Sequence, residues 1–331
     1  MRLAALIASA LAIGCGTPHP GGGLDATDGT GGGDDGGGGG GDDGGGGGDG
    51  SIDAPPTPAC PGWCRETAPA GTGLLYAVHA VNAGDVFAVG NGGTILRRRA
   101  NAWTTMTSGT TNNLRGVWAA SSSDAWAVGE AGTVLHFNGS TWAPVIGVST
   151  SDINAVWGSG ASDVWAVGPS KVFHYNGTAW SSITIVGALL SVSGTGPNDV
   201  WIAGENTYTH HYTGSWATVI PGTGATDFYA ILAISPTNVW ATGAVTSKET
   251  VNFTGGSTWT PHDTSAAVFQ DLHATGATDV WGVGGMQAGH WNGTSWTIAT
   301  PPGVTMSLWS VHGSGADIWV VGSGATILHR N

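Results

Sequence analysis

Five histidines recur at one position of a repeating sequence pattern, and they are the first candidates for chemistry. They are His136, His174, His211, His290 and His329, with Arg97 and Asn252 at the same place in two further repeats. Imidazoles bind metals and transfer protons near neutral pH. Equivalent positions of successive repeats lie far apart around a closed ring, so these side chains cannot share one ion. We expect each histidine to be hydrogen-bonded within its own repeat, and we predict no metal site, cofactor or catalytic residue.

Carboxylates offer the second kind of chemistry. A polysaccharide hydrolase or lyase needs paired carboxylates that meet at one site. The candidates outside the repeated acidic position are Glu130, Asp152, Glu205, Asp227 and Asp271. The sequence has no G-x-S-x-G nucleophile elbow, H-E-x-x-H zinc helix or phosphate-binding loop. The run Arg97–Arg99 is either a contact patch for an anionic partner or a solvated strand edge.

These residues are set in a repeat built around Asp163–Gly168, which reads Asp-Val-Trp-Ala-Val-Gly. Its copies begin at Asp85, Asp124, Asp163, Asp199, Asn238, Asp279 and Asp317. The successive spacings are 39, 39, 36, 39, 41 and 38 residues. A near-constant period of this size is typical of a repeat architecture.

Each repeat contains four strand-like runs, as the second repeat illustrates. The runs cover residues 114–119, 124–129, 133–137 and 141–146, and Asn138-Gly139 forms a tight turn before the last. Four short strands in each of seven repeats predict an all-β, seven-bladed β-propeller over residues 59–331.

The fourth run of each repeat carries a tryptophan, and this series predicts how the ring closes. Trp103 and Trp142 each precede the next first strand by 11 residues, and Trp63 precedes Leu74 by the same 11. We therefore expect residues 62–68 to supply the outer strand of the last blade, which would remove an open sheet edge.

The segment before the propeller predicts export and a flexible connection. Residues 1–14 have a charged start and an apolar run of eleven residues, which is typical of a signal peptide. Residues 15–58 are mostly Gly and Asp, so we expect a disordered, acidic linker. Because an exported chain meets an oxidising compartment, Cys60 and Cys64 are candidates for a disulfide, with two free thiols as the alternative.

Composition limits the partners. The net charge is −13, and the propeller segment carries 14 acidic and 8 basic residues, so we expect no nucleic-acid binding. Most of the 17 tryptophans fall at two fixed repeat positions, which indicates packing between blades. Trp118, Trp157, Trp291 and Trp309 lie off that pattern and are the candidate ligand-binding residues.

Two resemblances to known families accompany these patterns. Ala12-Ile13-Gly14-Cys15 resembles the lipobox of bacterial lipoproteins, which implies cleavage before Cys15 and lipid attachment to its thiol. Asp-Val-Trp-Ala-Val-Gly, followed by Gly-x-Val-Leu-His and Asn-Gly-x-x-Trp, resembles the propeller repeats of bacterial surface lipoproteins. These runs are also similar to tectonin repeats and to a degenerate Asp-box. Tectonins bind sugars and lipopolysaccharide, which implies a lectin-like function. A sialidase would need three converging arginines, but there is no arginine between residues 116 and 329.

We therefore expect a non-enzymatic lipoprotein of the outer membrane, facing the periplasm or the cell surface. It would be a monomer that binds a glycan or an envelope protein through loops at residues 205–209 and 245–249 on a propeller face. The alternatives are a polysaccharide hydrolase or lyase of the envelope, and a scaffold for envelope assembly.

Overall fold

The computed structural model describes residues 62–331, except 206–208, 223–226, 245–248, 257 and 265–266. All of these described residues belong to one compact unit, residues 57–331. The predicted signal peptide, Cys15, the linker and Cys60 lie outside the described residues. No helix in the described part of the chain is long and apolar enough to cross a membrane.

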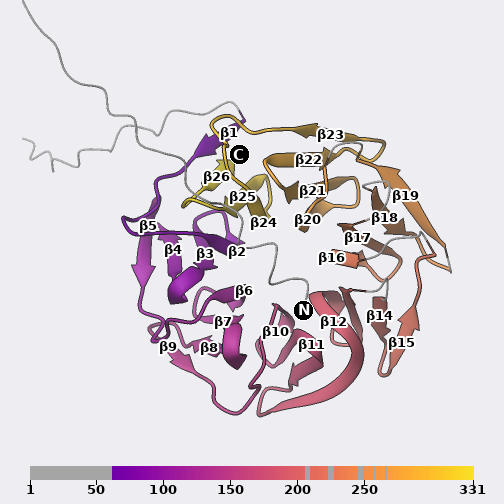
Figure 1. The fold of residues 1–331 in the computed structure, drawn as a ribbon, viewed down its shortest axis with the longest axis horizontal. Coiled ribbons are helices and arrows are strands. Elements are labelled where there is room, and N and C mark those ends of the chain that lie inside the picture. The colour runs from indigo at the N-terminus through magenta and orange to yellow at the C-terminus, as the bar shows by residue number, and fades with distance from the viewer. Residues whose placement is uncertain (1–61, 206–208, 223–226, 245–248, 257, 265–266) are drawn as a thin grey trace, which may run out of the picture. The chain divides into compact units, whose positions relative to one another are not determined.

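The unit is an all-β propeller whose sheets surround a central axis (Figure 1). In each four-stranded sheet, antiparallel strands follow one another from the axis outwards. The first two sheets are β2 (Leu75–Asn82), β3 (Asp85–Gly90), β4 (Ile95–Arg99) and β5 (Ala102–Met106), then β6 (Leu114–Ser121), β7 (Asp124–Gly129), β8 (Val134–Phe137) and β9 (Trp142–Pro144). The only helical segments described are two 3₁₀ turns, η2 (Asn91–Gly93) and η3 (Glu130–Gly132).

The later sheets continue the same arrangement. One large sheet contains β10 (Ala155–Gly160), β11 (Asp163–Tyr175), β12 (Trp180–Gly196), β13 (Asp199–Gly204), β14 (Thr209–Tyr212) and β15 (Trp216–Val219). The next two are β16 (Asp227–Ser235), β17 (Asn238–Ala244), β18 (Glu249–Phe253) and β19 (Trp259–Asp263), then β20 (Asp271–Gly276), β21 (Asp279–Gly284), β22 (Gln287–Trp291) and β23 (Trp296–Ala299).

The prediction of seven blades is wrong, because the strands form six sheets. The cause is β12, a continuous strand of 17 residues that belongs to two successive repeats. Its first part pairs with β11, up to Pro169↔Ala188, and its second part pairs with β13 from Leu189↔Gly204 onwards. The anchors of these two repeats are only 36 residues apart, the shortest spacing in the chain. No residues remain for a connecting loop, so the third and fourth repeats share one sheet.

The predicted closure of the ring is confirmed. The last sheet contains β24 (Leu308–Ser314), β25 (Asp317–Gly322) and β26 (Ile327–Arg330), and its outermost strand is β1 (Trp63–Arg65). β1 pairs antiparallel with β26 in the register Trp63↔Arg330. The first strand in sequence therefore completes the last sheet, as Figure 1 shows for the neighbouring β1 and β26.

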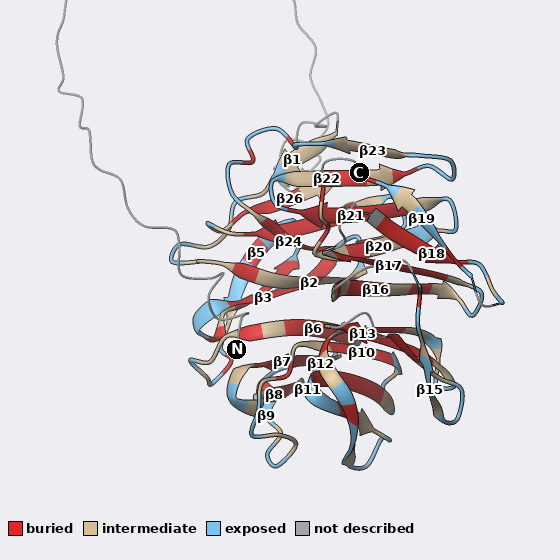
Figure 2. Cartoon of the chain, turned by 45° about the vertical axis from the view of Figure 1, so that its right-hand side comes forward, coloured by how far each residue is buried: buried red, intermediate tan, exposed pale blue. Residues whose placement is uncertain are grey.

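Aromatic side chains pack one repeat against the next, as predicted for the two fixed tryptophan positions. The second-strand ring of each repeat contacts the fourth-strand tryptophan of the following repeat, edge to face. The seven pairs are Phe87–Trp142, Trp126–Trp180, Trp165–Trp216, Trp201–Trp259, Trp240–Trp296, Trp281–Trp63 and Trp319–Trp103, with ring centroids 5.3–6.0 Å apart. Figure 2 shows the inner and middle strands largely buried and the loops exposed. The core is thus a ring of contacts between neighbours.

A candidate binding site in the central channel

The repeated histidines are structural, which confirms the expectation from sequence. In each of the five repeats Nε2 lies 2.6–2.8 Å from a carboxylate oxygen of the anchor aspartate. The anchor tryptophan stacks on the imidazole with centroids 3.8–4.2 Å apart. In four of the five repeats the Asp–His–Trp cluster joins the second strand to the third, and in the third repeat Asp163 and His174 both lie on β11 (Asp163–Tyr175). The hydrogen bond and the stacked ring hold each histidine within its own repeat.

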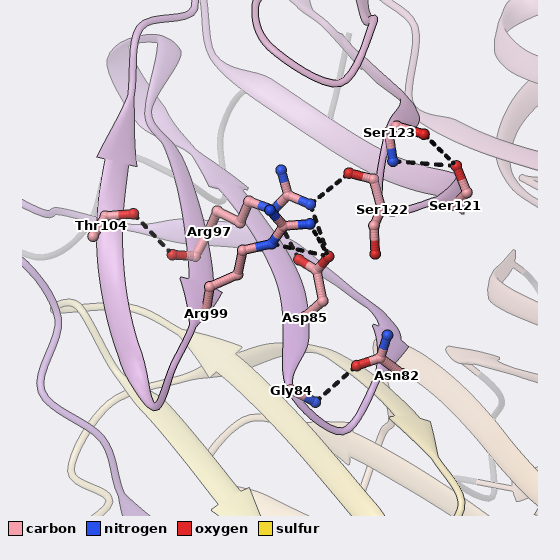
Figure 3. A network of polar contacts seen from close by, with 9 residues as sticks. All are labelled: Asn82, Gly84, Asp85, Arg97, Arg99, Thr104, Ser121, Ser122 and Ser123. Carbon is pink, nitrogen blue, oxygen red and sulfur yellow. Dashed lines mark hydrogen bonds and ion pairs between the residues drawn. The ribbon is translucent and has the colours of Figure 1, made fainter. Parts of the chain in front are cut away.

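The two repeats without this histidine keep the contact by other means. In the fifth repeat both partners are neutral, and Asn252 Nδ2 donates to Asn238 Oδ1 at 2.8 Å. In the first repeat Arg97 donates from Nε and from one terminal nitrogen to Asp85, at 2.8 and 2.7 Å (Figure 3). Its guanidinium also lies over the ring of Phe87. Arg99 donates to the same carboxylate.

The run Arg97–Arg99 is therefore not an exposed contact patch for an anionic partner, and only one of its three side chains is solvated. The side chains of Arg97 and Arg98 are only 7 and 8% exposed and are ion-paired to Asp85 and Glu66. Arg99 is more than half exposed, yet it also contacts Asp85. The run fixes the first repeat against its neighbours, because Arg97 also donates to the carbonyl of Ser122 in the second repeat.

The inner strands enclose a channel of about 380 Å³ on the central axis. Its lining residues come from equivalent positions of the repeats and form two tiers. The rim tier is the residue that follows the buried Leu, Ile or Phe at the start of each inner segment: Tyr76, Arg115, Asn154, Leu190, Tyr229, Gln270 and Trp309. The waist tier lies three residues further along: His79, Trp118, Trp157, Ser193, Leu232, His273 and His312. One half of the wall, on β20, β24, β2 and β6, carries most of the titratable groups.

Three histidines meet in the waist on neighbouring inner strands. The rings of His79 and His312 have centroids 4.1 Å apart, and those of His312 and His273 are 4.5 Å apart. Burial, then repulsion from His273, lowers the pKa of His79 to about 4. Burial also lowers the pKa of His273 to about 4, and burial with both neighbouring imidazoles holds that of His312 well below its usual range. All three are therefore neutral at pH 7.

The waist residues also join one inner strand to the next. Nδ1 of His312 accepts from the backbone N–H of Ala80 at 3.1 Å, and Oγ of Ser193 accepts from Ala233 at 3.0 Å. The two tryptophans of this tier, Trp118 and Trp157, lie against Gly158 and Gly194 of the following strand. A Cβ at either glycine would lie 2.6 Å from the indole ring. Glycine is therefore required next to each of these tryptophans.

A half-buried carboxylate lies on the same half of the wall. Asp271 accepts from the Ser310 hydroxyl at 2.7 Å, from Val311 N–H at 3.0 Å and from Leu272 N–H at 2.8 Å. Burial raises the pKa of Asp271 to about 6, against the opposing effect of these hydrogen bonds. The group is therefore largely an anion at pH 7, and its charge is sensitive to what enters the channel.

The rim above this carboxylate combines aromatic rings with a small ion cluster. The rings of Tyr76 and Trp309 have centroids 6.4 Å apart. Arg115 donates to Glu130 at 2.8 Å and lies 3.2 Å from Asp152, so two carboxylates surround one guanidinium. Burial raises the pKa of Glu130, but Arg115 and Asn113 lower it below its usual value overall. Burial, then Glu130, raises the pKa of Tyr76.

The structure brings together three of the four candidate tryptophans. Trp118, Trp157 and Trp309 line the channel. Trp291 does not, since it is buried against Trp240 and Trp296 in the packing between sheets.

The five candidate carboxylates fall into three groups. Glu130 and Asp152 lie around Arg115, and Asp271 lies inside the channel. Glu205 and Asp227 are bridge partners, and their charges raise the pKa of Tyr229 in addition to its burial. Because Glu205 and Asp227 occupy the repeat positions of Glu130 and Asp152, both pairs lie on the same face of the propeller. Arg115 lowers the pKa of Glu130 and also lies 3.2 Å from Asp152, and hydrogen bonds occupy both oxygens of Asp271.

Two other predictions concern residues that the structure describes only in part. Cys64 is disulfide-bonded, and the chain's other cysteines, Cys15 and Cys60, lie outside the described residues. The pairing of Cys60 with Cys64 therefore stays a prediction. Of the predicted binding loops, residues 206–208 and 245–248 also lie outside the described part.

The waist histidines were missed in the sequence, although a signal for them exists. His79 and His273 precede their anchor aspartates by six residues, and His312 precedes its anchor by five. A comparison of first strands would have placed them on one tier. Within the described ranges, no three His, Cys, Asp or Glu side chains are arranged to hold a metal ion.

Comparison with solved structures supports the fold. The chain is similar to YCF48 bound to a D1 peptide, with a TM-score of 0.67 and 14% identity over 81% of this chain and 96% of that one. Virginiamycin B lyase from Staphylococcus aureus gives a TM-score of 0.72 at 12% identity, over 81% of this chain and 98% of the lyase. The WD40 propeller domain of Doa1 gives 0.67 at 13%, over 78% of this chain and 93% of that domain. No protein-family model matches the sequence, and no curated protein matches it. These likenesses establish a β-propeller fold and leave activity open.

Proposed function

We propose that this protein is a non-enzymatic binding module whose central channel receives a segment of another protein. The observation that carries the proposal is the rim and waist of the channel. Tyr76, Trp309, Trp118 and Trp157 line it and are not members of the seven repeated pairs that join a second-strand ring to a fourth-strand tryptophan. Channels of this kind, with aromatic walls and a few polar groups, are typical of ligand sites. A narrow channel suits an inserted side chain or chain end better than the flat face of a sugar.

A relative in fold supports a protein partner. YCF48 is described as bound to a D1 peptide, and it shares this architecture over most of both chains. The propeller fold is therefore compatible with peptide binding, and we favour an envelope protein over a glycan as the partner.

The proposed location is the outer membrane, with the propeller carried on a lipid at Cys15. The support comes from the sequence, where a short apolar run ends at Gly14-Cys15. Two or more acyl chains give stable anchoring, since each buried methylene contributes about 0.8 kcal/mol. Cys15→Ala should move the protein from the membrane fraction to the soluble fraction and abolish labelling by radioactive palmitate. Palmitate labelling of the Cys15→Ala protein would refute the anchor.

The binding proposal is tested by blocking the channel. Gln270→Arg places a long charged side chain at the rim, and Thr297→Arg places the same side chain on β23, the outermost strand of its sheet. Immobilised wild-type protein and Thr297→Arg should capture the same protein from envelope extract, and Gln270→Arg should not. Equal capture by all three would refute a site in the channel. Binding on a glycan array that is lost in Gln270→Arg, without protein capture, would favour the lectin instead.

A polysaccharide hydrolase or lyase is the second candidate function. The observation that favours it is the placement of carboxylates on one face around a channel that holds Asp271, whose pKa of about 6 suits proton transfer. Purified protein incubated with envelope polysaccharide should then release reducing or unsaturated ends. Asp271→Asn should abolish that release.

A further inference from the structure

We infer that the segment received by the channel presents an arginine side chain, whose guanidinium stacks on the Tyr76–Trp309 rim and faces Asp271. This inference rests on the proposed function and names the chemistry of the partner. It is carried by the half of the channel wall formed by β20, β24, β2 and β6, all of which the structure describes.

The charge of this half-wall favours a cation. Asp271 lines the channel, and so does Arg115, whose guanidinium is ion-paired to Glu130 and Asp152, two carboxylates that are not among the lining residues. The three waist histidines add no charge at pH 7, because burial keeps their pKa values at about 4 or lower. Glu130 and Asp152 together exceed the charge of Arg115, so these three groups and Asp271 carry a net charge of about −2. A partly buried anion such as Asp271 interacts more strongly with an entering cation than an anion in bulk water does.

The aromatic groups favour a planar cation over a compact one. Tyr76 and Trp309 stand 6.4 Å apart at the entrance, and the imidazoles of His312 and His79 lie on the same two strands one tier below. A guanidinium stacks on aromatic faces and donates several hydrogen bonds in its plane, whereas an ammonium acts as a compact point charge. The protein uses the same contact internally, since Arg98 lies over Trp319 with its Cζ 4.5 Å from the ring centroid.

Asp271 is the polar end point for such a side chain. Its oxygens accept hydrogen bonds from Ser310, Val311 and Leu272, which fix the carboxylate in place without neutralising its charge. A guanidinium at this carboxylate would supply the positive charge that the group lacks. We expect the gain from a charge-assisted contact together with ring stacking to be about tenfold or more in affinity.

The test uses capped tripeptides Gly-Xaa-Gly as probes of the purified protein, with Xaa as arginine, lysine, citrulline or glutamate. Citrulline keeps the planar shape of arginine and removes its charge. Binding is followed by NMR shifts of the indole N–H groups of Trp309 and Trp118, both of which line the channel. We expect arginine to bind about tenfold tighter than citrulline, with lysine between them and no binding of glutamate.

Two variants make the result specific. Asp271→Asn should bring the arginine and citrulline affinities within about twofold of each other, and Asp263→Asn, at the end of the outermost strand β19, should leave the difference intact. Equal affinities for arginine and citrulline, or an unchanged preference in Asp271→Asn, would overturn the inference. Shifts of neither tryptophan with any peptide would also overturn it. The proposed function is judged separately, by whether capture from envelope extract is lost in Gln270→Arg.

Discussion

The ion pair of the first repeat gives the sharpest prediction about stability. Asp85 is 4% exposed, and four hydrogen bonds from Arg97 and Arg99 reach its carboxylate (Figure 3). Burial raises the pKa of Asp85, but the hydrogen bonds, from Arg97 foremost, lower it to about 2 from the usual 3.8. At about 1.4 kcal/mol per pKa unit, the carboxylate contributes about 2 kcal/mol to the free energy of unfolding.

The sign of the pH dependence follows from the lowered pKa. Because the folded-state pKa lies below the unfolded value, this contribution is fully present above about pH 4. It is lost as the pH falls through about 2. Asp85→Asn should cost about 3–5 kcal/mol at pH 7, because it also leaves the buried guanidinium of Arg97 without its counter-ion.

The chain itself supplies the matched control. The double variant Asp85→Asn, Arg97→Asn reproduces the neutral pair Asn238–Asn252 of the fifth repeat. We expect it to recover at least about 1 kcal/mol relative to Asp85→Asn, although it loses a charged contact. Urea unfolding of the wild type and the two variants at pH 7, 4 and 2.5 measures these differences. A loss below about 1 kcal/mol in Asp85→Asn, or a loss that stays constant from pH 7 to 2.5, would refute the reasoning.

Three further predictions follow from other contacts. Gly194→Ala should lower the free energy of unfolding by about 1–3 kcal/mol, because its Cβ would lie 2.5 Å from the carbonyl oxygen of Asp199 and 2.6 Å from the indole of Trp157. Gly196→Ala, with nothing within 4 Å, should cost little, and equal costs in urea unfolding would contradict this. Trp63→Ala should cost about 2–4 kcal/mol by removing the edge-to-face contact with Trp281, and an unchanged unfolding midpoint would show that β1 does not close the ring. Affinity for Gly-Arg-Gly should fall as the pH drops from 7 to 5, because Asp271, with a pKa of about 6, takes up a proton while the three waist histidines stay neutral. The affinity of Asp271→Asn should not change over this pH range. A pH-dependent affinity in that variant would show that another group titrates.

The features that recur in every repeat could be predicted from the sequence, whereas the number of sheets, which depends on one irregular repeat boundary, could not. The strands, the packing tryptophans and the closing role of Trp63 all follow from a period shared by every copy. The sheet count does not, because it depends on the missing loop between residues 180 and 196, where a single strand runs on. The channel could not be assembled in advance either. His79 lies 233 residues before His312, and only closure of the ring brings it next to His312 and His273.

Recurring residues could be interpreted from the sequence because a side chain that repeats meets the same partners each time. His174 with Asp163 and Trp165 is one such case. Residues that differ between repeats at an equivalent inward position, such as Tyr76, Arg115 and Trp309, do not take part in such a repeated contact. They are therefore the better guide to function.

The most direct test of the binding site is photo-crosslinking in the intact cell envelope. A benzophenone amino acid replaces Gln270 at the rim of the channel in one protein and Thr297 on the outermost strand β23 in another. On irradiation, position 270 should give one discrete crosslinked protein that position 297 does not give. Crosslinking of that protein from position 297 and not from position 270 would contradict a partner bound at the channel.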